Sequence, residues 1–267
     1  MTTVAVIPAR YSSTRFPGKA LAKDTGKYLV QHVYERVEAC AKIDRVIVAT
    51  DDERIVQAVK SFGGEARLTR ADHTSGTDRT GEAVSFLGLA EDDLVLNVQG
   101  DEPDIDPDDL AHLVDRMTAL GRDYEIGTLA ARFDDAGPKE GPGSPLDPNC
   151  VKVVADRAGR AMYFSRSPIP YLQDRAGAVD VPSRWLLHLG VYAFRLATLR
   201  AITSDGGLKR GVLEEAESLE QLRWLEHGIP VLVLVVDRAY VGIDTPEDYA
   251  AFVSRMSVRS GRVGAGK

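Results

Sequence analysis

The sequence predicts an α/β fold in which a mostly parallel, twisted sheet is flanked by helices and carries a β-rich insertion. Two observations lead to this prediction. Short apolar segments alternate with amphipathic, helix-like segments over the first hundred residues, which is the pattern of βαβ units. Between residues 125 and 195 this alternation stops, and several strand-like segments follow one another.

The amino-terminal elements follow from local patterns. A buried strand is expected at residues 4–7, and residues 26–41 carry apolar side chains at helical spacing. Asp51 is expected to cap a helix over 53–62, and Gly63 to end it. The remaining strands are predicted over 45–50, 65–68 and 94–98, and the remaining helices through Ala83 and Leu87 and over 106–120.

The middle of the chain is predicted to be an insertion, residues 125–195, that provides a substrate pocket and a dimer contact. Its strands are expected over 126–133, 150–154, 162–166 and 186–194, with a hairpin turn at 156–159. The sheet then resumes with a helix over 214–227, a strand over 231–236 and a last helix after Thr245-Pro246. We therefore expect one domain over residues 1–257 and a flexible tail over 258–267.

The composition excludes several classes of protein. With 267 residues and 44% apolar residues, the chain is long enough for a substantial core. Its net charge of −7 argues against nucleic acid as a partner. It has no apolar run of membrane-spanning length, its first strand leaves no room for a signal peptide, and its two cysteines form no disulfide framework. We expect a cytoplasmic protein without membrane contact.

Three cations lie close together beyond the first strand. Arg10, Arg15 and Lys19 follow residues 4–7, with Gly18 directly before the lysine. Ligands bind beyond the carboxyl ends of strands in open α/β sheets, and several cations around a turn suit a polyphosphate. The alternative is a basic surface loop with ordinary salt bridges. Neither the G-x-x-x-x-G-K-[ST] phosphate loop nor a G-x-G-x-x-G motif is present, so a nucleotide site of another design is expected.

Two aspartates are candidates for a magnesium site. Asp101 follows the strand predicted at 94–98, and Asp244 follows a strand late in the chain. Magnesium binds through a few carboxylates together with phosphate oxygens, so two carboxylates at a phosphate-binding rim fit it. Taken alone, Asp244 is better explained as the N-cap of the helix at Pro246, and Asp101 is equally well explained as a turn residue.

Polar residues elsewhere have a functional and a structural interpretation. Ser75 and Gly76 lie in a polar loop where backbone groups suit a base edge, whereas a helix cap at Thr77 explains the same loop structurally. Arg79 either reaches phosphate or braces this loop. Further along, Arg166 and His188 either bind a carboxylate or are structural, and Glu220, Gln221 and Arg223 are solvated helix residues when considered alone.

Taken together, the motifs resemble the 3-deoxy-manno-octulosonate cytidylyltransferases, also called CMP-Kdo synthetases. The similarity runs from Val4 to about residue 255. Seven segments carry it in order: IPARYSSTRFPGK (7–19), TRADHTSGTDR (69–79), NVQGDEP (97–103), YFSR (163–166), HLGVY (188–192), LEQLR (219–223) and GIDTPE (242–247). Tyr28, where many relatives have proline, is a departure that bears on the start of a helix.

The resemblance implies a nucleotide-diphospho-sugar transferase fold, a requirement for Mg²⁺ and a homodimer. The implied reaction couples CTP with 3-deoxy-manno-octulosonate (Kdo), releasing pyrophosphate, for lipopolysaccharide synthesis. It implies nucleotide binding by Arg10, Arg15, Lys19, Ser75, Gly76, Arg79 and Gln99, metal binding by Asp101 and Asp244, and sugar binding by Arg166, His188, Tyr192, Glu220 and Gln221. The implied catalytic residues are Arg10, Lys19, Asp101 and Asp244.

Other functions stay open on the sequence. Related enzymes activate 8-amino-Kdo, neuraminic acids or phosphonates, so the acceptor acid is less constrained than CTP. A non-catalytic nucleotide-binding module on the same fold is a further alternative. A glycosyltransferase would usually carry an Asp-x-Asp metal motif, and Asp101 and Asp104 have a different spacing.

Overall fold

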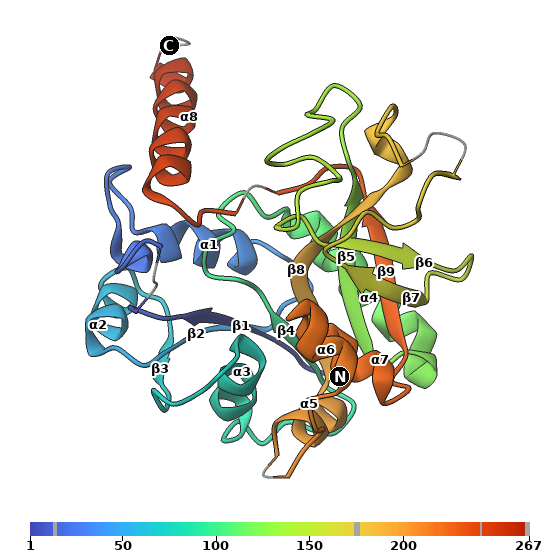
Figure 1. Ribbon diagram of the computed structural model, residues 1–267. Helices are drawn as coiled ribbons and strands as arrows, with labels where there is room; N and C mark the ends of the chain where they lie inside the picture. Colours follow the sequence, from blue (N-terminus) through green and yellow to red (C-terminus); the bar gives the residue numbers. More distant parts are fainter. Residues whose placement is uncertain (13–14, 174–176, 205, 241, 265–267) are drawn as a thin grey trace. The chain divides into compact units, whose positions relative to one another are not determined.

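The computed structural model describes residues 1–12, 15–173, 177–204, 206–240 and 242–264, and Figure 1 shows its helices and strands. Two compact units can be distinguished. The first comprises Met1–Ala90, Val95–Ala111 and Tyr240–Lys267, and the second Glu91–Leu94 and His112–Ala239. Strands that are mostly parallel, flanked by helices, confirm the predicted fold class.

The first unit is built on strands in the order β3 (Ala66–Leu68), β2 (Arg45–Thr50), β1 (Thr3–Ala9) and β4 (Leu94–Asn97). The strand β1 runs parallel to β2, with Val4 opposite Arg45 and Ala9 opposite Thr50. Its first apolar residues are almost completely buried, which explains their unbroken apolar pattern in the sequence. The loop that carries Arg10, Arg15 and Lys19 begins where this buried strand ends.

The helices of the first unit are α1 (Leu29–Glu38), α2 (Glu53–Ser61), α3 (Gly76–Val84) and α8 (Pro246–Gly264), with the short η1 (Lys19–Leu21) and the start of α4 (Pro107–Leu120). Of these, α2, α4 and α8 begin at or next to the residue that the sequence predicts, but the residues that cap α2 and α3 differ from the predicted ones. Asp52 rather than Asp51 caps α2, because its carboxylate accepts a hydrogen bond from the amide of Arg54. Likewise Ser75 rather than Thr77 caps α3, because its hydroxyl accepts from the amide of Asp78.

The last helix, α8, is capped by a reciprocal pair. Thr245 Oγ1 accepts from the amide of Asp248, and the Asp248 carboxylate accepts from the amide of Thr245. The carboxylate of Asp244 is therefore not the cap that its position suggested. The helix continues to Gly264, beyond residue 258 where a tail was expected, and residues 265–267 lie outside the described part.

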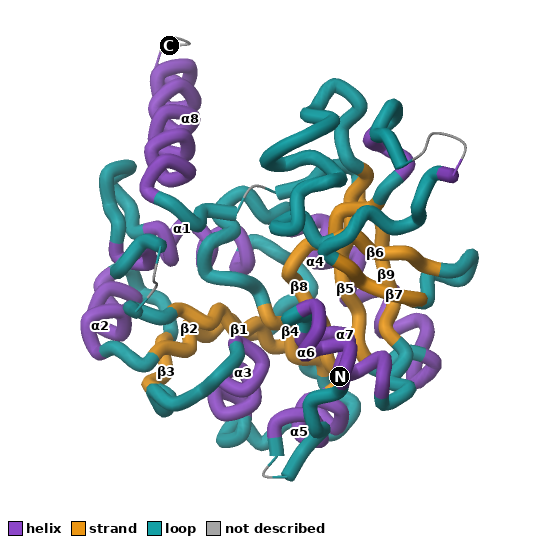
Figure 2. The backbone as a smooth tube through the Cα atoms, viewed as in Figure 1, coloured by secondary structure: helices purple, strands orange, loops and turns teal. Residues whose placement is uncertain are grey.

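The second unit has β5 (Ile126–Arg132) at its centre. This strand pairs antiparallel with β8 (Leu186–Arg195) and parallel with β9 (Val231–Val236). The hairpin of β6 (Lys152–Ala155) and β7 (Ala161–Ser165) turns at the predicted place, and β6 also pairs with β8. Figure 2 distinguishes these strands from the surrounding loops.

The helices of the second unit differ most from the prediction. The structure adds α5 (Leu196–Thr203), which follows β8 without any glycine or proline to mark the change. The single helix expected over 214–227 is wrong: α6 (Val212–Glu217) and α7 (Glu220–Glu226) are separated at Ser218, whose φ is 52°. Short helical turns lie at η2 (Gly121–Asp123) and η4 (Pro182–Arg184).

None of the helices in the described parts of the chain combines the length and the apolar character that crossing a membrane requires.

Candidate active site

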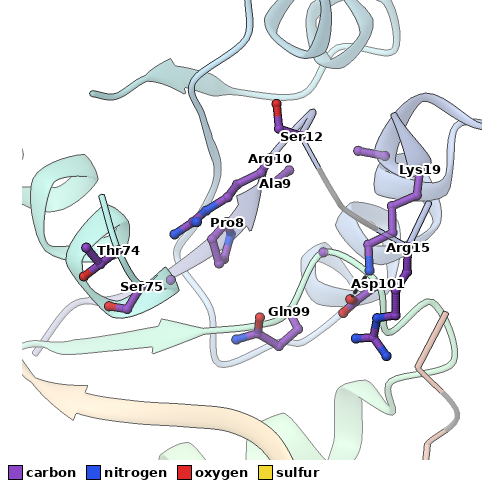
Figure 3. Close-up of a pocket in the computed structure, with 13 residues that line it drawn as sticks. Pro8, Ala9, Arg10, Ser12, Arg15, Lys19, Thr74, Ser75, Gln99 and Asp101 are labelled. Atoms are coloured by element: carbon purple, nitrogen blue, oxygen red, sulfur yellow. Dashed lines mark hydrogen bonds and ion pairs between the residues drawn. The ribbon is translucent and has the colours of Figure 1, made fainter. Parts of the chain in front are cut away.

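A pocket of about 410 Å³ lies in the first unit, at the carboxyl ends of β1 and β4. Figure 3 shows its wall of cationic, acidic and hydroxyl side chains. The lining residues are Pro8, Ala9, Arg10, Ser12, Arg15, Lys19, Ala20, Thr74, Ser75, Gly76, Gln99, Gly100 and Asp101. The structure thus brings together seven predicted residues from three separate sequence segments.

Lys19 is the centre of the charged side of the pocket. Its Nζ lies 2.5 Å from Oδ2 of Asp101, 3.2 Å from Oδ1 of Asp244 and 3.0 Å from the carbonyl oxygen of Ile243. The more exposed Arg15 lies 3.0 Å from the other carboxylate oxygen of Asp244. Both predicted aspartates therefore converge on one point, beside two of the three predicted cations.

The loop that carries these cations is closed by Gly18. Its amide donates to the carbonyl oxygen of Tyr11 at 2.8 Å, and its φ of 72° is in the left-handed region. A Cβ at this position would lie 3.1 Å from the Tyr11 ring. Glycine therefore allows the chain to turn back on itself before Lys19.

The oxygen atoms around Lys19 also fit a divalent cation. Two carboxylates and a peptide carbonyl are hard oxygen donors of the kind that Mg²⁺ prefers. Within the described residues, no three His, Cys, Asp or Glu side chains gather as a complete metal site. Mg²⁺ usually completes its coordination with water and substrate phosphates, so two carboxylates are sufficient.

A third acidic side chain, that of Glu102, lies beside the two aspartates. The side chain of Glu102 has a buried oxygen with no hydrogen-bond partner among the described residues. Burial, together with the carboxylates of Asp101 and Asp244, raises the pKa of Glu102 to about 8. A cation bound beside these acids would favour the ionised form of Glu102 and so lower its pKa.

The opposite side of the pocket carries polar groups without carboxylates, and Arg10 is its one cation among the lining residues. Figure 3 shows Ser75 and Gln99 on this side, with the side chain of Arg10 extending toward Thr74 and Ser75. The amide Nε2 of Gln99 donates to Asn97 at 3.2 Å, which orients the group. Hydroxyl and amide groups held in this way can form hydrogen bonds to the edge of a base.

Gly100 is a site residue that the sequence analysis missed. A Cβ at this position would lie 2.9 Å from the carbonyl oxygen of Pro8, a backbone atom that cannot move without displacing the end of β1. Only glycine permits the loop after β4 to approach β1 this closely. In the sequence, the one indication that Gly100 belongs to the site is its position between the predicted site residues Gln99 and Asp101.

Arg79 lies beneath the pocket wall rather than in it. Its side chain has no exposed surface, and its guanidinium donates to Thr69 Oγ1 and, at 2.9 Å, to the carboxylate of Asp51. These contacts join the loop before α3 to the end of β2. Of the two interpretations considered for Arg79, this geometry favours the brace.

The predicted sugar-binding residues all lie in the second unit. Arg166 follows β7, and its Nε and Nη1 donate to the carbonyl oxygens of Glu217 and Pro148 at 2.7 and 2.9 Å. The Glu217 carboxylate in turn accepts from the amide of Arg166 and from the hydroxyl of Ser165. Arg166 is thus held against the junction between α6 and α7.

His188 and Tyr192 form an aromatic group on β8. Their ring centroids are 5.4 Å apart, and the ring of Phe164 meets His188 edge-on at 5.0 Å. Burial lowers the pKa of His188 to about 3, so its imidazole is neutral near pH 7. Tyr192 also packs edge-on against Trp224 of α7 at 4.9 Å.

The last two predicted sugar-binding residues begin α7. Gln221 is buried, and Glu220 is partly exposed and 3.8 Å from Arg223. Because Tyr192 contacts Trp224, α7 is packed against the strand that carries His188. The five predicted residues therefore belong to connected elements of one unit.

Comparison with known proteins identifies the family. The family model described as cytidylyltransferase matches residues 4–233. The chain belongs to the cytidylyltransferase family.

Two members of this family are particularly informative. The 3-deoxy-manno-octulosonate cytidylyltransferase of Syntrophobacter fumaroxidans is 48% identical over 253 residues, which are 95% of this chain and 96% of the relative. The 8-amino-3,8-dideoxy-manno-octulosonate cytidylyltransferase of Shewanella pealeana is 43% identical over 97% of this chain and all of the relative.

A solved cytidylyltransferase has the same fold. The structure of CMP:2-keto-3-deoxy-manno-octonic acid synthetase complexed with CTP is 40% identical in sequence to this chain. It superposes with a TM-score of 0.85 over 97% of this chain and all of the other. The predicted family resemblance and fold type are confirmed.

Proposed function

We propose that this protein is a 3-deoxy-manno-octulosonate cytidylyltransferase, which couples CTP and Kdo to give CMP-Kdo and pyrophosphate. The observation that carries the proposal is the convergence of Lys19, Asp101 and Asp244 at the pocket beyond β1 and β4. Cations and carboxylates at one point suit the transfer of a nucleotidyl group between two anionic substrates. The product would serve lipopolysaccharide synthesis, and the cytoplasmic location stays a prediction.

The reaction requires positioning more than a protein nucleophile. The anomeric hydroxyl of Kdo attacks the α-phosphorus, the bond from that phosphorus to the pyrophosphate oxygen breaks, and the hydroxyl proton passes to solvent. Arg10 and Lys19 would neutralise the departing pyrophosphate, and Arg15 would bind the triphosphate. Ser75, Gly76 and Gln99 would contact cytosine, since they are uncharged residues that line the same pocket.

Asp101 and Asp244 would hold Mg²⁺, because their oxygens already surround the ammonium of Lys19. When bound, the ion would neutralise phosphate charge and lower the pKa of the attacking hydroxyl. The two carboxylates keep this position through a backbone link, in which the amide of Ile243 donates to the carbonyl oxygen of Asp101 at 2.9 Å.

The acceptor would be bound by the second unit. Arg166 would pair with the sugar carboxylate, and His188, Tyr192, Glu220 and Gln221 would contact the remaining groups. We favour Kdo over 8-amino-Kdo because the relatives named for Kdo have 43–48% identity, against 43% for those named for the 8-amino sugar. The homodimer implied by the family resemblance is part of the same proposal.

The proposal is tested by incubating the protein with each of the four nucleoside triphosphates and a panel of acids, while pyrophosphate release is followed. The panel contains Kdo, 8-amino-Kdo, a neuraminic acid and a phosphonate. Release with CTP and Kdo alone is the expected result. Release with another acid instead would replace Kdo as acceptor, and no release with any pair would favour a non-catalytic nucleotide-binding module.

A further inference from the structure

The pairing of β8, the strand with His188, and β5 is interrupted by a β-bulge. Thr128 on β5 is opposite Tyr192, whereas the next residue, Leu129, is opposite Leu189. Gly190 and Val191 are therefore extra residues on β8. Bulges of this kind redirect side chains beside functional sites, and Thr128 lies fully buried beneath this one.

The hydroxyl of Thr128 has three neighbours on β8. Its Oγ1 lies 2.7 Å from the carbonyl oxygen of Val191, 3.3 Å from that of Leu189 and 3.0 Å from Nε2 of His188. Carbonyl oxygens only accept hydrogen bonds, and a hydroxyl has a single proton to donate. Since the shortest contact is to Val191, the proton of Thr128 is committed to that carbonyl.

The protonation of His188 follows from this arrangement. With its proton on the side of Val191, the Thr128 oxygen can only accept from Nε2 of His188, which must therefore carry a hydrogen. In the opposite tautomer, Nε2 would carry no hydrogen and would accept the proton of Thr128. Oγ1 of Thr128 and the carbonyl oxygen of Val191 would then face each other at 2.7 Å without a proton between them. We propose that Thr128 is a positioning residue that fixes His188 as the Nε2-protonated tautomer, so that Nδ1 is offered to the acceptor sugar as a hydrogen-bond acceptor.

The surroundings of the ring support this assignment. Phe164 and Tyr192 hold the imidazole from two sides, and the backbone amide of His188 donates to the carbonyl oxygen of Val151 at 2.8 Å. Among the residues that the structure describes, none is hydrogen-bonded to Nδ1, and His188 as a residue is partly exposed. Nδ1 is thus the ring nitrogen that remains for a ligand.

The consequence is a division of roles in the sugar site, and it depends on the function proposed above. The neutral imidazole accepts a hydrogen bond at Nδ1, so it can pair with a sugar hydroxyl. It cannot form a hydrogen bond with a carboxylate through Nδ1, because a carboxylate has no hydrogen to donate. The carboxylate of the sugar is then left to Arg166, the permanent cation among the predicted sugar-binding residues. His188 would therefore recognise a hydroxyl of the sugar and not its carboxylate. A sugar analogue without that hydroxyl would bind more weakly, because Nδ1 would be left without a hydrogen-bond partner.

The tautomer can be measured directly on the wild-type protein. Long-range ¹H–¹⁵N correlation spectra of the ¹⁵N-labelled chain near pH 7, with H188Q to assign the signals, report the protonation of each ring nitrogen. We expect a protonated Nε2 and an unprotonated Nδ1 for His188. A protonated Nδ1, alone or in an imidazolium, would overturn the proposal whether or not the protein turns over Kdo.

Kinetics of two Thr128 variants test the positioning role. T128V keeps the shape but removes the hydroxyl, so we expect the KM for Kdo to rise about tenfold while the KM for CTP stays within twofold. T128S retains the hydroxyl, so we expect both KM values and the tautomer to be as in the wild type. An unchanged KM for Kdo in T128V, or an equal rise in both KM values, would contradict the proposal.

A wrong tautomer for His188 can be distinguished from the absence of the proposed activity. If T128V does not fold, the wild-type spectrum still decides the tautomer. If the wild type releases no pyrophosphate from CTP and Kdo, the proposed function fails, and the spectrum alone decides whether Thr128 fixes the imidazole.

Discussion

The ammonium group of Lys19 lies 2.5 Å from a carboxylate oxygen of Asp101, although the two residues are 82 positions apart in the sequence. This pair joins the loop after β1 to the loop after β4. Both side chains are largely shielded, with 16% and 25% of their surfaces exposed, so the interaction is stronger than an ordinary surface ion pair. The same acid is a proposed metal ligand, which makes it the most informative position to change.

D101N is expected to lower kcat at least about 100-fold and to leave the protein folded. The amide keeps the size of the side chain but loses the charge needed for the metal, while Lys19 retains Asp244 and the Ile243 carbonyl as partners. Pyrophosphate release over a range of Mg²⁺ concentrations measures the loss, and the thermal midpoint reports folding.

D104N is the matched control for this change. Asp104 lies on the same segment but pairs with Arg255 at 2.8 Å, and it does not line the pocket. Its replacement should leave kcat and the Mg²⁺ dependence as in the wild type. Wild-type turnover in D101N, or an equal loss in both variants, would refute the role of Asp101.

The meeting of Lys19 and Asp101 could be predicted because it follows from a general rule of α/β folds. Parallel strands have their carboxyl ends at one edge, so residues that follow β1 and β4 must meet there. The local alternation of apolar and amphipathic segments was enough to locate these strands. No knowledge of side-chain packing was needed.

Other features depend on contacts that a linear pattern does not contain. The inward position of Arg79 is decided by Asp51 and Thr69, which come from two other segments. The break between α6 and α7 depends on the left-handed conformation of Ser218, a residue with no strong preference for it. The role of Thr128 requires the register of β5 on β8, which the alternation of apolar residues does not specify.

G100A is expected to weaken nucleotide binding by displacing backbone. The added Cβ would lie 2.9 Å from the Pro8 carbonyl oxygen, so the loop after β4 and the end of β1 must separate where they form the pocket. We expect a higher KM for CTP and a loss of about 1–3 kcal/mol in the free energy of unfolding, measured by steady-state kinetics and urea unfolding.

G242A provides the comparison, because a Cβ at Gly242 meets no atom within 4 Å. It should change the KM for CTP and the stability much less than G100A does. Equal effects of the two substitutions, or a G100A enzyme with normal CTP binding, would show that the close approach at Pro8 is unimportant.

E217Q is expected to raise the KM for Kdo about tenfold without changing the KM for CTP. The Glu217 carboxylate accepts from the Ser165 hydroxyl at 2.5 Å and from the Arg166 amide at 2.8 Å. A glutamine turns one of these acceptors into a donor and loosens the turn that holds Arg166. E215Q, on the exposed side of α6, is the control, and a normal KM for Kdo in E217Q would count against this role.

The buried imidazole of His188 should make stability depend on pH. The pKa of His188 is lowered to about 3 in the folded protein by burial, whereas in the unfolded chain it is near its ordinary 6.5. As the pH falls below 6.5, the unfolded chain binds a proton that the folded protein does not take up until about pH 3. The stability contributed by neutral His188 is therefore complete above pH 6.5 and is lost toward pH 3, by up to about 1.4 kcal/mol per pH unit.

Urea unfolding of the wild type and H188Q at several pH values between 7 and 5 isolates this contribution. The other titratable groups are shared by both proteins, so the difference between their pH slopes belongs to His188, whatever the absolute stability of the variant. We expect the wild type to lose stability more steeply than H188Q as the pH falls. Parallel slopes would mean that the folded protein accepts a proton on His188 as readily as the unfolded chain, and that its imidazole is not held neutral.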